Sequence, residues 1–305
     1  MTTIALIGPG AIGGTFAAWL MQVPGNDVVL CARTPFDRLV VRAPGAQTLE
    51  ATPRVLTDPE SILPAAHAAR VDWVVAVTKT YATGEAARWI ERLAGPETAV
   101  AVVQNGVEHL ERFRGLVPSE RTLPVITDVP AERTAPGQIW QRRHGVTTAP
   151  EGELGRRFVA LFQGTPFAPV LTDDFLTASW TKLVLNSAGV VNALTLKPAG
   201  VANNEKAAAL MQAIATETLS VGRALGAQLR REWPAEIVAR FRDSPPDSVN
   251  SLLADRLADR PLEIDARNGV VVRRGADVGI PAPLNAMAVA ILEAATERAG
   301  PTGKR

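Results

Sequence analysis

The feature that most constrains the fold is a glycine-rich turn near the N-terminus, between a short apolar run and a longer helix-like stretch. Residues 3–13 read TIALIGPGAIG, so Gly8, Gly10 and Gly13 follow the run directly. The first glycine permits a tight turn, the second lets backbone approach a phosphate, and the third lets the helix pack against the strand. The segment predicts a dinucleotide site in an α/β domain, or else only a tight turn. The predicted site comprises Gly8, Pro9, Gly10, Ala11, Ile12 and Gly13.

The first half of the chain alternates short apolar runs with helix-like stretches. The runs are Ile4–Ile7, Val28–Leu30, Trp73–Val77, Thr98–Val103 and Leu123–Ile126. This alternation is typical of a parallel sheet wrapped by helices. The segment 135–148 predicts a hairpin or edge strands, and Arg142, Arg143 and His144 within it predict a solvated face.

The pattern changes near residue 172, where strand signals give way to helical spacing of apolar residues. The predicted helical segments are 175–194, 205–225, 234–243, 248–258, 262–278 and 283–299, with a frayed tail at 301–305. Prolines punctuate them, including Pro245, Pro261 and Pro281. We therefore predict two domains, residues 1–171 for cofactor binding and residues 172–305 as a helical domain.

Composition excludes several classes of protein. The 305 residues carry 32 Lys and Arg against 31 Asp and Glu, which gives no electrostatic argument for nucleic acid or an anionic membrane as partner. No apolar run reaches the length of about 18 residues that a membrane span needs. The lone Cys31 excludes an intrachain disulfide and fits a reducing, cytoplasmic location. His67, His109 and His144 are scattered, so we predict no metal site.

Polar residues follow several of the apolar runs, where the strands of a parallel sheet bind ligands. Arg33 follows the second run, Lys79 the third, and Asn105 the fourth. Arg33 stands 20 residues after Gly13, where NAD-binding folds usually carry an acid for the ribose hydroxyls. An arginine there suits a 2′-phosphate, so we predict NADP(H) as cofactor. Arg33 and Lys79 can also be read as solvated surface residues, and Asn105 with Gly106 as a plain turn.

A helix-like segment in the second half carries a candidate proton donor. Lys182 and Asn186 stand at i and i+4, on one helix face, with Leu183, Val184 and Leu185 between them. A lysine in an apolar cleft near a cofactor can donate a proton, because partial burial lowers its pKa. The alternative is a lysine at a helix edge with its ammonium group in water.

The C-terminal motifs complete a resemblance to the ketopantoate reductase family. The lysine segment reads WTKLVLN, and SVNSLLADRLADRP is followed by LEIDARNG. The family resembles this chain in its N-terminal glycine loop, in an Arg after the second strand, and in a Lys and an Asn-Gly pair that each follow a later strand of the sheet. It also has a W-x-K-L-x-x-N helix, and S-x-x-x-D followed by E-I-D-x-x-N-G. This chain has all of these motifs in the same order over nearly its whole length.

The resemblance implies an α/β N-terminal Rossmann domain plus an all-α C-terminal domain, with an active-site cleft between them. It implies NADPH-dependent reduction of 2-dehydropantoate (ketopantoate) to pantoate, by hydride transfer to C2, in pantothenate and coenzyme A biosynthesis. Lys182 matches the family's general acid, and Glu263 the carboxylate that holds this lysine and the substrate hydroxyl. The matching substrate-binding residues are Asn105, Asn186 and Ser251, and the matching cofactor-binding residues outside the glycine loop are Arg33, Lys79 and Asn105.

Two positions depart from the family pattern. Val190 stands where the family often has a second asparagine, and on a regular helix Asn192 would lie roughly 80° away from Lys182, on the side opposite Asn186. Ala82 replaces a family glutamine. These changes leave open another branched 2-keto acid as substrate. A lysine-dependent hydroxy-acid or opine dehydrogenase is a separate alternative, against which the E-I-D-x-x-N-G segment argues. A non-catalytic NADP-binding sensor protein is a third, and the presence of both Lys182 and Glu263 favours an enzyme instead. The oligomeric state stays open between monomer and homodimer, because the apolar stretch 283–296 suits either an interface or the core.

Overall fold

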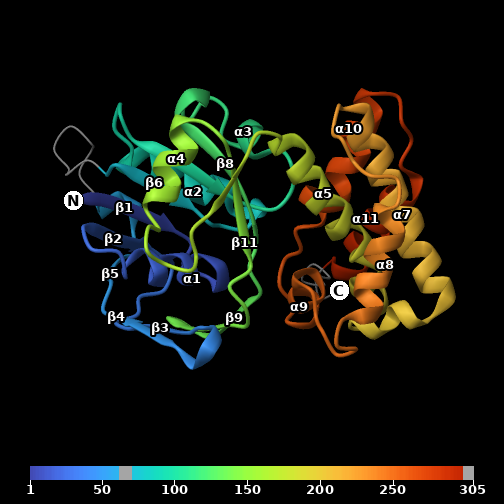
Figure 1. Cartoon of the computed structure of the whole chain (residues 1–305), viewed down its shortest axis with the longest axis horizontal. Helices are drawn as coiled ribbons and strands as arrows, with labels where there is room; N and C mark the ends of the chain where they lie inside the picture. The colour runs from blue at the N-terminus through green and yellow to red at the C-terminus, as the bar shows by residue number, and fades with distance from the viewer. Residues whose placement is uncertain (62–70, 298–305) are drawn as a thin grey trace, which may run out of the picture. The chain divides into compact units, whose positions relative to one another are not determined.

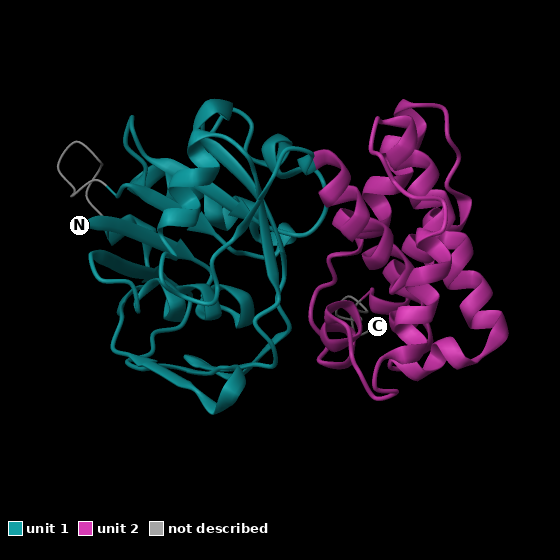
Figure 2. Cartoon of the chain, in the orientation of Figure 1, with its two compact units in different colours: residues 1–175 teal, residues 176–305 magenta. Residues whose placement is uncertain are grey.

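A computed structural model describes residues 1–61 and 71–297 and divides the chain into two compact units, Met1–Phe175 and Leu176–Arg305 (Figure 2). The first unit is α/β and the second is helical, which confirms the predicted fold class (Figure 1). Two features named from the sequence, His67 and the tail at 301–305, lie outside the described residues.

The first unit contains all the strands among the described residues. In chain order its elements are β1 (Thr2–Ile7), α1 (Ala11–Leu20), β2 (Asn26–Cys31), β3 (Leu39–Arg42), β4 (Thr48–Ala51), β5 (Arg54–Leu56), β6 (Trp73–Ala76), α2 (Thr83–Leu93), β7 (Ala99–Val103), α3 (His109–Arg112), β8 (Thr122–Asp128), β9 (Ala131–Ala135), β10 (Gln138–Gln141), β11 (Val146–Pro150), α4 (Glu153–Ala160) and β12 (Val170–Thr172).

The larger sheet has the strand order β12-β11-β8-β7-β6-β1-β2-β5. Strands β2, β1, β6, β7 and β8 run parallel, which confirms the sheet predicted from the apolar runs. Along β1, Ile4 and Leu6 belong to one buried apolar cluster, while Ala5 and Ile7 belong to another. Helix α1 contributes to the first cluster and α2 to the second. Both faces of the sheet are therefore covered, which explains why its strands are continuous apolar runs.

Helix α1 is enclosed, because it contacts strands of both sheets of this unit. Every residue from Gly13 to Leu20 is buried. A Cβ atom at Gly14 would collide with Cδ1 of Ile139 in β10, so a larger residue here would displace the end of that side chain. The indole Nε1 of Trp19 donates a hydrogen bond to Oε1 of Gln141 at 2.9 Å. The helix is thus packed on its two sides, apart from its first turn.

The smaller sheet has the order β4-β3-β10-β9, and the sequence predicted it only in part. Its strands β9 and β10 form the antiparallel pair expected near 135–148, whereas β3 and β4 match none of the predicted runs. Exposed ion pairs hold Arg142 to Glu132 (2.8 Å) and Arg143 to Asp128 (3.2 Å). His144 is instead half-buried, with its ring 5.8 Å from the Trp19 ring, so the predicted solvated face is wrong at this residue.

The second unit is built of helices. They are α5 (Phe175–Ala188, which begins at the last residue of the first unit), α6 (Val190–Thr195), α7 (Glu205–Ala224), α8 (Trp233–Asp243), α9 (Ser251–Leu257), α10 (Val270–Asp277) and α11 (Pro283–Thr296), with a π-helical turn at Asp265–Gly269.

These elements confirm the predicted helical segments, with one break and one π-helical turn. The first segment is interrupted at Gly189, where a Cβ atom would lie 2.9 Å from Nδ2 of Asn250 and 3.3 Å from a guanidinium nitrogen of Arg267. The segment 262–278 includes the π-helical turn before α10. Among the described residues, no helix is both long and apolar enough to cross a membrane.

Candidate functional site

The glycine loop between β1 and α1 has the geometry that its spacing predicts. Gly8 has a φ of +84°, and its N–H donates to the carbonyl oxygen of Cys31 at 3.0 Å. A Cβ atom at Gly13 would collide with the Gly8 carbonyl oxygen and lie 3.3 Å from Leu6 Cδ2. At Gly10, by contrast, no atom lies within 4 Å of the position that a Cβ would take. Gly8 and Gly13 therefore shape the loop, and Gly10 leaves open space beside it.

The first turn of α1 presents backbone N–H groups without a side-chain cap. The N-cap is Gly10, and no acidic residue stands in the first turn. An uncapped helix N-terminus carries a partial positive charge and binds anions. Together with the open space at Gly10, this arrangement fits the pyrophosphate of a dinucleotide.

The strand ends beside the loop form one continuous edge. The N–H of Val77 donates to Ile7 O at 2.9 Å, and a Cβ atom at Gly8 would lie 3.0 Å from Thr78 Cγ2. Gln104, directly after β7, reaches the neighbouring strand end, since its Nε2 donates to Thr78 O at 3.1 Å. Strand β1 lies between β6 and β2, where the strand order reverses, and such switch points bind ligands in open α/β sheets.

The other predicted cofactor residues lie just after these strands. Arg33 follows β2 with 83% of its side chain exposed, and its Nε lies 3.9 Å from Oε1 of Glu85 on α2. Lys79 is half-buried after β6, and Asn105 is half-buried after β7. The Asn105 carbonyl oxygen accepts a hydrogen bond from Arg112 at 2.9 Å, and Gly106 has a φ of +91°. The proximity of Glu85 to Arg33 could not be predicted from the sequence, because Glu85 stands on the later helix α2.

Cys31, at the end of β2, is buried and not disulfide-bonded. Burial raises the pKa of its thiol to about 12. The thiolate is the reactive form of cysteine, so this side chain is chemically inert and acts as part of the core.

In the second unit, the predicted catalytic residues belong to two segments. Lys182 and Asn186 are half-buried on α5, with Leu183 and Val184 buried between them. Glu263 is 5% exposed and directly precedes the short helical segment that contains the π-helical turn. Asn105 belongs to the first unit, so its proximity to Lys182 and Glu263 stays a prediction.

The remaining predicted substrate residue, Ser251, is exposed at the first position of α9. Its neighbour Asn250 is the N-cap of this helix and accepts a hydrogen bond from Leu253 N at 2.9 Å. The Asn250 amide also donates to Oδ1 of Asn192 at 3.1 Å and to Gly189 O at 2.9 Å. Asn192 is 1% exposed, and the angle estimated for it on a regular helix does not apply because the helix breaks at Gly189.

One residue of this region was not singled out from the sequence. Arg267 is 2% exposed, donates to Asn186 O, and has NH1 3.4 Å from Ser251 Oγ. Burial lowers its pKa to about 10, while the carboxylates of Glu263 and Asp255 oppose that shift. Its position inside the E-I-D-x-x-N-G motif was the available signal. The motif's Asn268 is fully buried and donates to Asn285 Oδ1 at 2.9 Å, which indicates a structural role.

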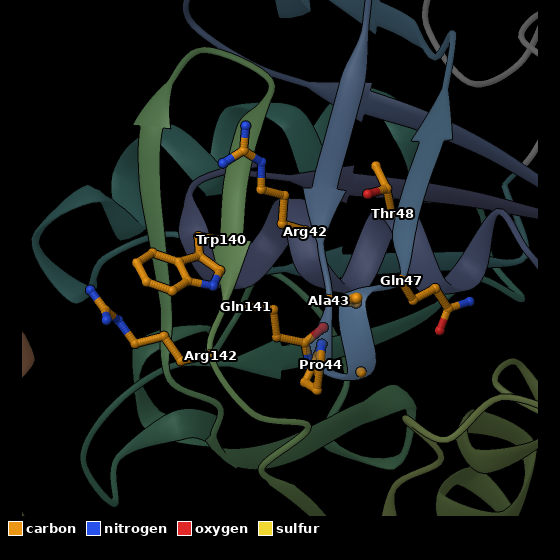
Figure 3. A pocket seen from close by; sticks show the side chains of 10 residues that line it. Arg42, Ala43, Pro44, Gln47, Thr48, Trp140, Gln141 and Arg142 are labelled. Carbon is orange, nitrogen blue, oxygen red and sulfur yellow. The ribbon is translucent and has the colours of Figure 1, made fainter.

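A shallow hollow of about 350 Å³ lies over the smaller sheet (Figure 3). Arg42, Trp140 and Arg142 line it, and the Arg142 guanidinium lies 4.1 Å from the Trp140 ring centroid. None of the predicted site residues lines this hollow. No group of three or more potential metal ligands occurs in the part of the chain that the structure describes.

Comparison with known proteins gives matches along nearly the whole chain. Residues 4–153 match the family model described as ketopantoate reductase PanE/ApbA, and residues 174–296 match the model of its C-terminal part. The chain is 52% identical to 2-dehydropantoate 2-reductase of Caulobacter vibrioides over 295 residues, which cover 97% of this chain and 99% of the relative.

Solved structures agree with these matches. A PanE/ApbA family ketopantoate reductase from Ralstonia eutropha is similar with a TM-score of 0.85 and 26% identity, over 97% of this chain and 98% of that one. A ketopantoate reductase from Staphylococcus aureus, described as dimeric, has a TM-score of 0.83 at 21% identity, over 96% and 98% of the two chains. The fold described above is therefore shared with reductases of this kind.

Proposed function

Because the chain belongs to the ketopantoate reductase family, we propose that it is an NADPH-dependent 2-dehydropantoate 2-reductase, which converts ketopantoate to pantoate. The observation that carries the proposal is the near-full-length similarity to the Caulobacter enzyme. The reaction would supply pantoate to pantothenate and coenzyme A biosynthesis in the cytoplasm. In this proposal residues 1–171 bind the cofactor and residues 172–305 carry the catalytic lysine. A homodimer, as described for the Staphylococcus relative, is part of the proposal.

The cofactor assignment rests on the glycine loop and on Arg33. The backbone at Gly8, Gly10 and Gly13 and the uncapped start of α1 would hold the pyrophosphate. The exposed Arg33 would bind the 2′-phosphate, since a guanidinium group matches phosphate geometry. Lys79 would bind the cofactor beside it. When bound, NADPH supplies the hydride.

Residues of the second unit would provide the proton and orient the substrate. Hydride addition to C2 places negative charge on the keto oxygen, and the Lys182 ammonium would donate its proton to that oxygen, which yields the alcohol. A positioned cation stabilises this transition state more than the ground state. Glu263 would hold the lysine and the substrate hydroxyl, and Asn186 would also bind a substrate hydroxyl. Ser251 would bind the carboxylate, and Asn105 would contact nicotinamide and substrate.

The departure at Val190 supports a second candidate within the same chemistry, the reduction of another branched 2-keto acid. Val190 is fully buried and apolar, so it offers no hydrogen bond where the family often has an amide. The third possibility, a non-catalytic NADP-binding sensor, needs the glycine loop and Arg33 but has no need of Lys182 with Glu263.

The test is NADPH oxidation with ketopantoate, followed beside pyruvate, 2-ketoisovalerate and NADH. Fast turnover with ketopantoate and NADPH alone is the expected result. Preference for 2-ketoisovalerate would move the assignment to the second candidate. Tight NADPH binding without turnover of any keto acid would refute the enzyme and favour the sensor.

A further inference from the structure

The second unit encloses a guanidinium group among the residues assigned to the substrate. Arg267 is 2% exposed, although arginine is rarely buried to this extent unless it is paired. Within the described part of the chain its Nε has no hydrogen-bond partner, while its two terminal nitrogens reach other elements. Burying a cation costs free energy, so the buried guanidinium group of Arg267 indicates a specific role for this residue.

Both terminal nitrogens of Arg267 contact residues assigned to the substrate. NH2 donates to the main-chain oxygen of Asn186, one turn after Lys182 on α5. NH1 lies 3.4 Å from Oγ of Ser251, at the start of α9. One planar group thus links the two helices that present Asn186 and Ser251.

Two carboxylates act on the same guanidinium group. Glu263 and Asp255 both favour its charged form. Asp255 also accepts from Nε of Arg260 at 2.9 Å, so a second cation compensates it. Glu263, which is 5% exposed and assigned to the catalytic lysine, therefore has a fixed positive charge near it.

The local backbone accounts for this placement. Arg267 is the central residue of the π-helical turn Asp265–Gly269, in which Ala266, Arg267, Asn268 and Gly269 are all buried. Asp265, at the start of the turn, is exposed and pairs with Arg273. Single π-helical turns within helices occur frequently at functional sites.

We infer that Arg267 is a positioning residue for the substrate carboxylate and acts through Ser251. A serine hydroxyl that accepts a hydrogen bond from a guanidinium group keeps its own O–H to donate to an anion. The bond to Asn186 O holds the end of α5 against the same group, so the contacts to the carboxylate and to the keto oxygen stay in register. This inference rests on the proposed function, because that function assigns Ser251 and Asn186 to the substrate.

The experiment compares Arg267→Ala and Arg267→Lys with the control Arg223→Ala, which removes an exposed arginine from the last turn of α7. Circular dichroism and NADPH affinity are measured first, and then KM and kcat for ketopantoate. We expect KM to rise about 10- to 100-fold in Arg267→Ala, the range typical for losing a hydrogen-bond partner that orients a metal ligand. Arg267→Lys keeps the positive charge but has only one nitrogen in place of two terminal ones, so its KM should be intermediate. NADPH affinity should not change, and millimolar guanidinium should lower the KM of Arg267→Ala.

Each outcome decides the matter. A KM within twofold of wild type in folded Arg267→Ala overturns the inference, and so does an equal rise in Arg223→Ala or a failure of guanidinium to lower KM. If Arg267→Ala does not fold, Arg267→Lys decides by the same twofold limit. Absence of ketopantoate turnover by the wild-type protein refutes the proposed function, and the role of Arg267 with it.

Discussion

Two glycines of the N-terminal loop should respond differently to the same small substitution. At Gly13 a Cβ atom would lie 3.1 Å from the Gly8 carbonyl carbon and closer still to its oxygen, and both are backbone atoms that cannot rotate away. At Gly10 the position of a Cβ is open to 4 Å. Gly13→Ala therefore forces β1 and α1 apart, whereas Gly10→Ala only occupies space that we assign to the pyrophosphate.

The magnitudes follow from this difference. Overpacking of a buried contact costs about 1–3 kcal/mol, so Gly13→Ala should lower the free energy of unfolding by that amount. Gly10→Ala should cost about 0.5–1 kcal/mol, the lower part of the range for placing Ala at a helix N-cap. It should weaken NADPH binding about tenfold or more, since a loss of about 1.4 kcal/mol in binding is tenfold in Kd.

Urea denaturation without cofactor and NADPH fluorescence titration measure the two quantities separately. Gly25→Ala is unsuitable as a control because Gly25 has a φ of +93°, whereas Gly84→Ala places a Cβ in open space on α2 at an ordinary φ. If Gly10→Ala binds NADPH as tightly as wild type, the loop does not hold the pyrophosphate. If Gly13→Ala is as stable as Gly84→Ala, the close approach of β1 and α1 is not a constraint.

Three further substitutions or reactions test single assignments. Lys182→Ala should lower kcat about 10²- to 10⁴-fold with unchanged NADPH affinity. As a control, Lys206→Ala removes an exposed lysine of the same unit and should leave kcat unchanged. Retained turnover in Lys182→Ala would exclude this lysine as the general acid. Arg33→Ala should weaken NADPH binding about tenfold without affecting NADH, against Arg38→Ala as control, because a charged hydrogen bond contributes about 1.5–3 kcal/mol before solvent screening. Cys31 has a thiol pKa raised to about 12, so it stays protonated at pH 8 and should react with a thiol reagent only after denaturation; rapid labelling of the folded protein would contradict its burial.

The parts of the fold that the sequence predicted are those with a strong local signal. The parallel strands are continuous apolar runs, and the helices of the second unit are long stretches in which apolar residues recur with helical spacing. Strands β3 and β4 have four residues each, and their half-buried alternation is too short to distinguish from loop. β4 pairs locally with β3, but β3 also pairs with β10, almost a hundred residues later, and no local pattern carries that information.

The candidate site also has features that could be predicted from the sequence and features that could not. The residues after the strands could be predicted, because the carboxyl ends of parallel strands meet at one edge. The proximity of Glu85 to Arg33 could not, because the two residues are brought together only by the packing of α2. Nothing local in the sequence signals that Arg267 is buried, because its contacts are with Asn186 on α5 and Ser251 on α9.

The enclosure of α1 has a consequence for how the glycine loop moves. A helix packed against two sheets opens only when the surrounding structure unfolds, so its amide protons should exchange with solvent as slowly as the slowest in this unit. The loop is anchored to that helix, and its N–H groups are therefore already aimed before any anion arrives. A ligand that docks on such a rigid element loses little free energy to ordering the protein, and its residence time reflects the contacts alone.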